Sequence, residues 1–502
     1  MSRMHASLWS AAETPLALPP LTADAEVDVV VVGGGITGLT AALLLSGAGQ
    51  RVIVLEARRL GSGVTSGSTF HLTEAVDRGY HQIERDFGKE GARLVAESSR
   101  AAIEQVSSLV QAHGISCDFV RRPGLLYTDQ ATNVDELKKE HEAAARAGLP
   151  VELLESASLP FTTRAAVRFP DQAQMHGLRY LGGLAKAAAA QGVQLHEGSR
   201  VVTIEDGEPC TIHLENGPTV RAKKVLVATH APLNRVFLQT KIHAYRSYVL
   251  AFSLPASALP DALFWDTLDP YHYFSSFAVD GAPYLVVGGE DHKTGTETGT
   301  DQHFDALLAW TKERFPVAQP AFRWSAQVEE PVDGLPYIGR NSASDNVYVA
   351  TGFSGNGITF GTLAARIVTD LVIGRASPWA ELYAATRIKP LAAAAEFTSE
   401  NVDFPMHFFS DRLRPVEAKT PEDIAPGEGK TLRVKGERLA CYRDPQGSLH
   451  AVSCVCTHLG CLVKFNSAAT SWDCPCHGSR FGVDGEVLDG PATRPLAKKQ
   501  VL

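Results

Sequence analysis

The chain has 502 residues, of which 44% are hydrophobic and 21% charged, and its formal net charge is −9. This length and balance predict a globular protein of two or three domains, and the acidic charge argues against a nucleic-acid partner, which would leave a basic footprint. No apolar run reaches the roughly 18 residues of a membrane helix, and residues 1–26 lack the apolar segment of a signal peptide, so we expect a cytoplasmic protein without a membrane span.

The first predicted elements follow an N-terminal segment whose three prolines predict an extended arm on the surface. Residues 27–32 are a β-branched run that predicts a strand. A glycine-rich turn, a helix over 36–46 and a second strand over 51–55 come next. This order of elements is typical of a dinucleotide-binding unit.

The glycine-rich turn, GGGITG over residues 33–38, fits the pattern G-x-G-x-x-G. Gly33 permits the tight turn, Gly35 lets a pyrophosphate approach the backbone, and Gly38 lets the helix pack closely on the strand. The free N–H groups at the start of the helix favour phosphate binding. Glu56, at the end of the second strand, can accept hydrogen bonds from the hydroxyls of an adenosine ribose.

The middle of the chain mixes helical and strand patterns. Apolar spacing over 87–113 predicts a long helix, and a second glycine-rich turn over 352–357 precedes a helix predicted over 362–373. A pyridine-nucleotide disulfide reductase would need a second dinucleotide fingerprint and a cysteine pair, and this region has neither, which favours FAD. Short strand patterns occur at 201–204, 220–228, 284–287 and 347–350.

Two parts of the chain, residues 22–80 and 322–375, resemble the two ends of the D-amino-acid oxidase family of FAD-dependent oxidoreductases, which includes glycine-oxidase-like and sarcosine-oxidase-like flavoproteins. The late glycine-rich turn of such proteins brings backbone N–H groups and a helix N-terminus up to the flavin ring. The segments that carry the resemblance are 29–38, 56–58, 61–69, 333–339 and 352–357.

The resemblance implies an α/β FAD-binding domain of Rossmann-like, glycine-oxidase type with an inserted mixed-sheet substrate domain, all within residues 1–400. Its FAD-binding parts are expected at about 25–85, 195–235 and 325–390, with the substrate part between them. The residues expected to bind FAD are Gly33, Gly35, Gly38, Glu56, Ala57, Arg58, Val201, Thr229, Gly352, Ser354, Gly355, Asn356 and Gly357.

The C-terminal part is predicted to be a separate module. Residues 395–420 are polar and irregular, and we place a linker at 401–415. Short β-like runs separated by turn signals follow, which predicts an all-β domain over 416–502. Six of the eight cysteines lie between positions 441 and 476, and in a chain without an export signal such clustering favours a metal site over a disulfide scaffold.

Two short motifs in this domain each supply one thiolate and one imidazole. A Rieske [2Fe–2S] cluster needs two thiolates on one iron and two imidazoles on the other. A zinc site with the same four ligands is the competing interpretation, but Cys₂His₂ zinc sites usually pair Cys with Cys and His with His, which argues against it. The four ligands, read from the motifs CTH and CPCH, are Cys456, His458, Cys474 and His477.

With its segments CTHLGC and CPCHGS, this domain resembles the Rieske family in the form that has two extra cysteines. The resemblance implies a disulfide between Cys461 and Cys476 that ties the two ligand loops together. Ser479 matches a serine that donates a hydrogen bond to a cluster sulfide, whereas Phe481 stands where high-potential members have a tyrosine. Because hydrogen bonds to sulfur stabilise the reduced cluster, Phe481 predicts a lower reduction potential.

The whole chain resembles bacterial FAD-dependent oxidoreductases that carry a C-terminal Rieske domain. We expect an amine or amino acid to be oxidised at FAD and its electrons to pass singly through the cluster to an external acceptor. The alternative is an electron-transfer module that takes electrons from a protein partner and has no small-molecule substrate. Arg246 could pair with a substrate carboxylate. The catalytic candidates are His71, Arg246 and Tyr273, followed by Tyr245, Tyr271 and His292.

Overall fold

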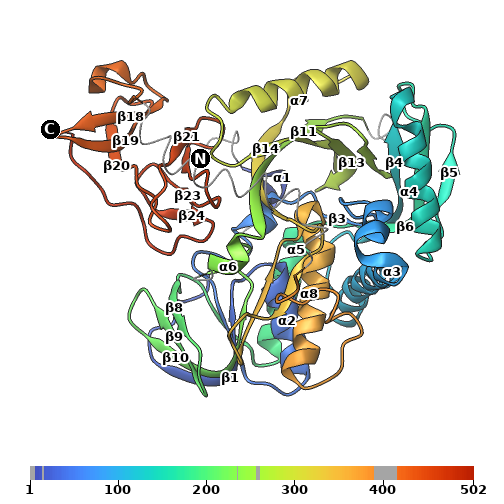
Figure 1. Ribbon diagram of the computed structural model, residues 1–502, viewed down its shortest axis with the longest axis horizontal. Coiled ribbons are helices and arrows are strands. Elements are labelled where there is room, and N and C mark those ends of the chain that lie inside the picture. The colour runs from blue at the N-terminus through green and yellow to red at the C-terminus, as the bar shows by residue number, and fades with distance from the viewer. Residues whose placement is uncertain (1–5, 14–15, 234–235, 256–260, 389–414, 502) are drawn as a thin grey trace.

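The computed structural model describes residues 6–13, 16–233, 236–255, 261–388 and 415–501. These residues form a sheet with a parallel centre that is covered by helices, a second large sheet beside it, and a small C-terminal β domain at one side (Figure 1). The expected linker, residues 401–415, lies outside the described residues apart from its last position.

An eight-stranded sheet forms the base of the larger part. Its main path runs β16-β17-β10-β1-β2-β7, with β9 paired to β10 and β8 to β9. β1 is central and pairs in parallel with β2 and β10, which explains why its valines are buried on both faces. The strands are β1 (Ala25–Val32), β2 (Val52–Leu55), β7 (Gln194–His196), β8 (Val201–Glu205), β9 (Cys210–Leu214), β10 (Thr219–Val227), β16 (Tyr337–Arg340) and β17 (Val347–Thr351).

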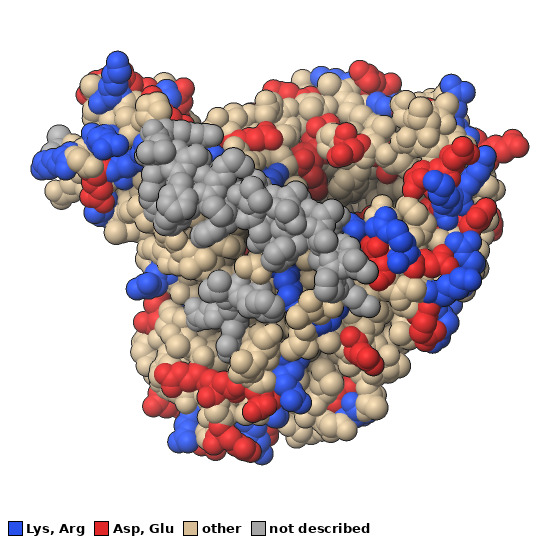
Figure 2. Space-filling model, viewed as in Figure 1, with Lys and Arg blue, Asp and Glu red and all other residues tan. Residues whose placement is uncertain are grey.

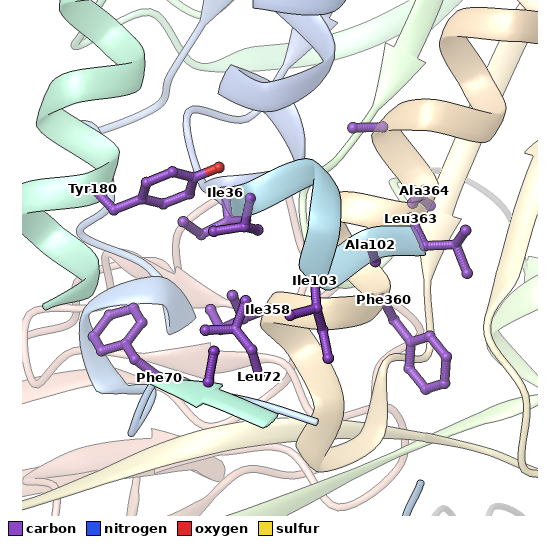
Figure 3. Packing of buried hydrophobic residues seen from close by; sticks show 14 of the residues in the cluster. Ile36, Phe70, Leu72, Ala102, Ile103, Tyr180, Ile358, Phe360, Leu363 and Ala364 are labelled. Carbon is purple, nitrogen blue, oxygen red and sulfur yellow. The ribbon is translucent and has the colours of Figure 1, made fainter. Parts of the chain in front are cut away.

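Helices pack against this sheet and build the main core. Ile36 at the start of α2 and Ile358 at the start of α8 lie together beside Phe70 and Leu72, so the two helices begin side by side (Figure 3). α8 begins earlier than the sequence pattern predicts, since glycine is a poor helix former and masks its first turn. The helices are α1 (Leu8–Ala12), α2 (Ile36–Gly47), α3 (Tyr80–Ala112), α4 (Val134–Arg146), α5 (Gly177–Ala190), α6 (Val236–Gln239), α7 (Asp301–Arg314) and α8 (Gly357–Val372).

A nine-stranded mixed sheet stands beside the eight-stranded sheet. Its main path runs β15-β11-β14-β13-β12-β4-β6-β3, with β5 paired to β6, and α7 lies across it (Figure 1). The strands are β3 (His71–Leu72), β4 (Val120–Thr128), β5 (Glu152–Leu154), β6 (Ala165–Gln174), β11 (Ile242–Ser253), β12 (Leu263–Asp266), β13 (His272–Val279), β14 (Ala282–Lys293) and β15 (Phe322–Pro331).

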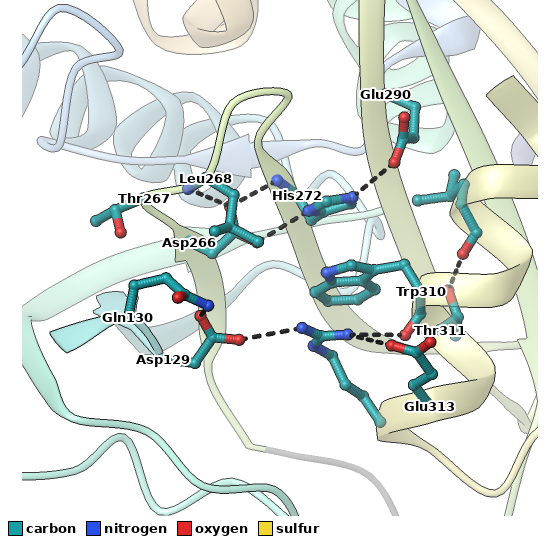
Figure 4. Close-up of polar contacts among 12 residues, drawn as sticks. Asp129, Gln130, Asp266, Thr267, Leu268, His272, Glu290, Trp310, Thr311 and Glu313 are labelled. Carbon is teal, nitrogen blue, oxygen red and sulfur yellow. Dashed lines mark hydrogen bonds and ion pairs between the residues drawn. The ribbon is translucent and has the colours of Figure 1, made fainter. Parts of the chain in front are cut away.

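A buried polar network fastens α7 to the mixed sheet (Figure 4). His272 of β13 is 2.9 Å from Asp266 through Nδ1 and 3.1 Å from Glu290 through Nε2. Its ring stacks on Trp310 of α7 with centroids 4.3 Å apart. Burial opposes protonation of His272, but the two carboxylates outweigh it and raise its pKa, so the network is held by charge as well as by packing.

The C-terminal β domain, residues 415–501, contains two small antiparallel sheets. The three-stranded sheet lies at the outer end, and the four-stranded sheet lies nearer to the rest of the molecule (Figure 1). The strands are β18 (Gly429–Val434), β19 (Glu437–Arg443) and β20 (Leu449–Ser453), then β21 (Lys464–Asn466), β22 (Ser471–Asp473), β23 (Arg480–Phe481) and β24 (Val487–Asp489).

The N-terminal arm differs from the sequence expectation, because part of it is anchored in the core. Trp9 of α1 is 0% exposed, and its indole Nε1–H donates to the Ser68 carbonyl at 2.8 Å. Its ring packs edge-on against Phe277 at 4.8 Å. Burial of the large apolar surface of Trp9 stabilises this anchoring, although the prolines that follow favour an extended segment.

The molecular surface mixes charges of both signs. On the face drawn in Figure 2, lysine and arginine are interspersed with aspartate and glutamate. Within the described parts of the chain, no helix combines the length and the apolar character that crossing a membrane requires.

Candidate functional site

A cavity of about 270 Å³ lies where the carboxyl ends of β1, β2, β10 and β17 face the mixed sheet. Open α/β sheets bind ligands at this edge. The two large sheets form two walls of the cavity, and residues 487–493 of the C-terminal β domain form a third. Two of the glycines expected to bind FAD, Gly38 and Gly352, are absent from the lining. The expected FAD residues that line the cavity are Gly33, Gly35, Glu56, Ala57, Arg58, Val201, Thr229, Ser354, Gly355, Asn356 and Gly357.

One end of the cavity has the features of a dinucleotide site. A Cβ at Gly38 would lie 1.9 Å from the Gly33 carbonyl oxygen, so only glycine lets α2 pack this closely on the turn. The Glu56 carboxylate accepts hydrogen bonds from the Gly34 and Arg58 N–H groups, both at 2.8 Å. These bonds fix the carboxylate at the cavity wall next to the start of α2. The arrangement fits the ribose and pyrophosphate of FAD.

The opposite end of the cavity is aromatic. His71, Trp265, Tyr271 and Tyr273 line it, and the His71 ring lies edge-on to Tyr273 with centroids 5.9 Å apart. His71 Nε2 is 2.7 Å from the Ser275 hydroxyl, and burial lowers the His71 pKa to about 3, so its ring is neutral. Burial raises the pKa of Tyr273, which keeps its hydroxyl protonated. Two of the three catalytic candidates therefore meet here.

Three carboxyl groups that the sequence did not predict lie near one another at this end, and one of them, Asp77, lines the cavity. Asp77 accepts a hydrogen bond from the Gly355 N–H at 2.5 Å, and Glu330 accepts one from the Ser354 hydroxyl at 2.7 Å. Desolvation by the surrounding protein raises the pKa of Asp77 to about 6, of Asp291 to about 7 and of Glu330 to about 8. The only sequence signal was an acidic residue inside a strand for Asp291 and Glu330, and Asp77 lies in a turn that gave no signal.

Arg246, the third catalytic candidate, does not line this cavity. It is 2% exposed and lines a second cavity, together with Arg58, Arg480 and Asp489, rather than the main one. Its Nη2 donates to the Ser325 hydroxyl, and burial lowers its pKa to about 10. Its pairing with a substrate carboxylate stays a prediction. Of the further candidates, Tyr271 lines the main cavity, whereas Tyr245 and His292 do not.

Two loops of the C-terminal β domain bring the expected cluster ligands together, and they share one backbone pattern. In the first loop, residues 456–461, the Cys456 N–H donates to the Cys461 carbonyl at 2.8 Å and the Gly460 N–H donates to the Cys456 carbonyl at 3.1 Å. The second loop, residues 474–479, repeats both bonds at the same two distances. Each loop is thus a closed turn that begins with a cysteine.

The four expected ligand side chains lie in two pairs. The thiols of Cys456 and Cys474 are in hydrogen-bond contact, which lowers the pKa of Cys456. The rings of His458 and His477 have centroids 5.0 Å apart. Burial lowers the pKa of His458 to about 4 and of His477 to about 3, so both imidazoles are in the neutral form that binds metal. This donor set matches what a Rieske cluster needs.

A disulfide joins the two loops, as the resemblance to the Rieske family implies. Cys461 and Cys476 have sulfurs 1.97 Å apart and Cα atoms 6.5 Å apart, and both sulfurs lie within 4.8 Å of the Cys474 sulfur. The Ser479 hydroxyl accepts a hydrogen bond from the Ala492 N–H at 3.2 Å. Phe481 is 0% exposed in the core around the ligand cysteines.

Comparison with known proteins agrees with this division into two parts. Residues 28–371 match the family model of FAD dependent oxidoreductases, and residues 414–500 match that of the Rieske [2Fe-2S] domain. The chain therefore belongs to the FAD-dependent oxidoreductase family and carries a Rieske domain at its C-terminus. It is an oxidoreductase whose cofactors are FAD and a [2Fe–2S] cluster, and the predicted cofactors are confirmed.

One relative spans both parts of the chain, and two others span the oxidoreductase part. A protein of Bacillus subtilis (strain 168) named as a Rieske 2Fe-2S iron-sulfur protein, YhfW, is 32% identical over 97% of this chain and 96% of its own length. The gamma-glutamylputrescine oxidoreductase of Escherichia coli (strain K12) is 26% identical over 74% of this chain and 90% of its own. Glycine oxidase from Geobacillus kaustophilus shares the fold, with a TM-score of 0.61 at 20% identity over 72% of this chain and 99% of its own. The predicted fold class is confirmed.

Proposed function

We propose that the protein is a flavin-dependent dehydrogenase that oxidises an amine or amino acid and delivers the electrons through its Rieske domain to an external acceptor. When bound, FAD supplies two-electron oxidation and the [2Fe–2S] cluster supplies single-electron transfer. The observation that carries the proposal is that residues 487–493 of the Rieske domain line the cavity expected to hold FAD. Electrons could therefore pass from one part of the protein to the other. The names of the gamma-glutamylputrescine oxidoreductase and glycine oxidase relatives support an amine or amino-acid substrate.

The aromatic and acidic end of the cavity suits the recognition of an ammonium group. The rings of Trp265, Tyr271 and Tyr273 offer faces for cation–π contact. An amine is oxidised as its free base, and the Asp77 carboxylate is placed to take the proton from the ammonium nitrogen. Its raised pKa of about 6 lies near the value that suits a general base at neutral pH.

The charged side chains that line the cavity indicate whether the protein prefers amines or amino acids as substrates. Among the described lining residues, the arginines are Arg58 and Arg200, and both belong to the end that holds Glu56. We therefore expect amines without an α-carboxylate to be better substrates than α-amino acids, since a carboxylate beside Asp77 would be repelled.

The test is an anaerobic panel of primary amines, diamines, N-methylated amino acids and plain amino acids, with NADH and NADPH as controls. Flavin absorbance reports oxidation of the substrate, and EPR reports reduction of the cluster. We expect an amine to bleach the flavin and the Rieske signal to follow. If the whole panel leaves the flavin oxidised while a protein reductase reduces it, the protein is an electron-transfer module instead.

We also propose that the protein works in the cytoplasm and that its acceptor is a separate one-electron carrier. Its buried cysteines outside the two ligand loops form no disulfide, which is usual in a reducing compartment; they are Cys117, Cys210, Cys441 and Cys454. Fractionation of cells that produce the protein at natural levels tests the location; recovery in a periplasmic or secreted fraction would contradict it.

A further inference from the structure

The second ligand loop of the Rieske domain lies in backbone contact with the mixed-sheet part of the oxidoreductase domain. Gly295, after β14, has φ +73°, and a Cβ there would lie 2.7 Å from the Pro475 nitrogen and 2.8 Å from the Cys474 carbonyl carbon. On the other side of the contact, a Cβ at Gly478 would lie 2.2 Å from the Ala244 Cβ. No larger residue fits at either glycine while the two parts keep this distance.

Buried hydrogen bonds hold the same contact. Gln327 is 1% exposed, lines the flavin cavity, and donates from Nε2 to the Gly478 carbonyl at 3.0 Å. Thr300, also fully buried, donates to the Asn466 side-chain oxygen at 2.7 Å and accepts from the Ala468 N–H at 3.1 Å. The residue next to ligand His477 is therefore one side chain away from the flavin cavity.

A second contact completes the wall of the cavity. The Val487 carbonyl accepts a hydrogen bond from Arg200 Nη2 at 3.3 Å, and Asp489 Oδ1 lies 3.6 Å from His230 Nδ1. His230 and Asp489 both line the cavity. The Rieske domain is thus fixed at two separate points, one at the ligand loop and one at the flavin cavity.

We propose that the Rieske domain works from this docked position, with Gly295, at the ligand loop, and Thr300, at residues 466 and 468, as positioning residues that hold the domain at the cavity wall. The inference rests on the proposed function and adds that reduction of the cluster needs no movement of the domain. In each transfer one electron passes from reduced FAD to the cluster and one ferric ion becomes ferrous. The external one-electron acceptor reoxidises the cluster between two such transfers, and FAD returns to its oxidised form with release of its protons to solvent.

The chain offers a matched pair of variants to test this. Gly295 and Gly299 lie in the same loop and both have φ +73°, so alanine strains the backbone equally at the two sites. A Cβ at Gly295 meets the backbone of the ligand loop, whereas a Cβ at Gly299 has nothing within 4 Å. Gly295→Ala should displace the loop, and Gly299→Ala should leave it in place.

Two readouts on the holoprotein are used. Hydrogen exchange of the amides of residues 474–479 reports docking without any reaction. Photochemical reduction of the flavin, followed by freeze-quench EPR of the cluster, reports transfer without any substrate, so failure of this proposal can be told apart from failure of the proposed substrate oxidation.

In Gly295→Ala we expect faster amide exchange and a few-fold slower reduction of the cluster, because the rate of electron transfer falls as the distance between donor and acceptor grows. Gly299→Ala should match the wild type. Wild-type exchange and transfer in Gly295→Ala, or equal defects in both variants, would overturn the proposal.

If Gly295→Ala does not fold, Thr300→Val takes its place, because it removes the two bonds to residues 466 and 468 and leaves the shape of the side chain unchanged. Exposed Thr298→Val is its control. Thr300→Val should also show faster amide exchange and slower reduction of the cluster. A Thr300→Val protein whose amide exchange and cluster reduction match those of its control contradicts the proposal.

Discussion

We propose that Glu56 is the side chain on which recognition of FAD depends most. Its two oxygens are fixed by the N–H groups of Gly34 and Arg58, so the carboxylate meets a ribose without having to be ordered first. Sequence alone predicted this residue, because its place at the end of the second strand follows from the dinucleotide-binding pattern.

Glu56→Gln should weaken FAD binding by roughly 10- to 100-fold, since hydrogen bonds to charged groups contribute about 1.5–3 kcal/mol. Titration of apoprotein with FAD, followed by flavin fluorescence, measures the Kd. Glu26→Gln, an exposed position at the start of β1, is the control and should bind like the wild type. Equal affinity in Glu56→Gln would show that FAD does not depend on this carboxylate.

Asp77 should give flavin reduction its pH dependence. The ionised carboxylate is the form that accepts a proton, so the rate of flavin reduction by substrate should fall as the pH drops through about 6 and level off above it. Asp77→Asn should lose this inflection and reduce the flavin about 100-fold more slowly. Stopped-flow rates between pH 5 and 9 test this, with exposed Asp135→Asn as control; an unchanged profile in Asp77→Asn removes it from the proton transfer.

Phe481 should keep the reduction potential of the cluster low, because it fills the buried core beside the ligand cysteines without donating a hydrogen bond to a sulfur. Phe481→Tyr places a hydroxyl among the ligand cysteines and should raise the midpoint potential by about 60 mV, the one-electron equivalent of a tenfold change in binding. Redox titration monitored by EPR measures it. A potential equal to that of the wild type would mean that the hydroxyl does not reach a sulfur.

At the scale of elements, the hydrogen-bonded network of His272, which packs α7 on the mixed sheet, should stabilise the fold to a degree that depends on pH. The folded pKa of His272 is raised, so its contribution to stability is fully present below pH 6.5 and is lost as the pH rises through the folded value. His272→Gln should lower stability by about 1–3 kcal/mol at pH 6, and by less at pH 9. Thermal unfolding at the two pH values tests this against exposed His113→Gln; a difference that grows with pH would contradict the sign.

The elements show where sequence reasoning succeeds and where it stops. The β1–α2–β2 unit was predicted because glycine spacing and a β-branched run are local signals, and the ligand loops were predicted because Cys and His spacing is local too. The wall formed by residues 487–493 and the acidic group of Asp77, Asp291 and Glu330 were not predicted. They come from contacts between segments distant in the chain, which no local pattern encodes.

At the scale of the whole molecule, direct contacts join the cavity to the ligand loops of the Rieske domain. The flavin cavity is closed on one side by the Rieske domain, and Gln327 reaches from that cavity to the second ligand loop. Sequence predicted both domains but not their docking, since Gly295 and Gly478 are ordinary loop glycines until the other domain is placed against them.

The most direct test of the central claim is single-turnover EPR of the wild-type holoprotein beside a Cys456→Ser, Cys474→Ser double variant, using the substrate that bleaches the flavin. The account predicts that flavin absorbance falls in both proteins, that a Rieske signal then appears in the wild type alone, and that only the wild type reduces a one-electron acceptor. A wild-type flavin that is bleached while the cluster stays oxidised, or a double variant that reduces the acceptor at the wild-type rate, would contradict it.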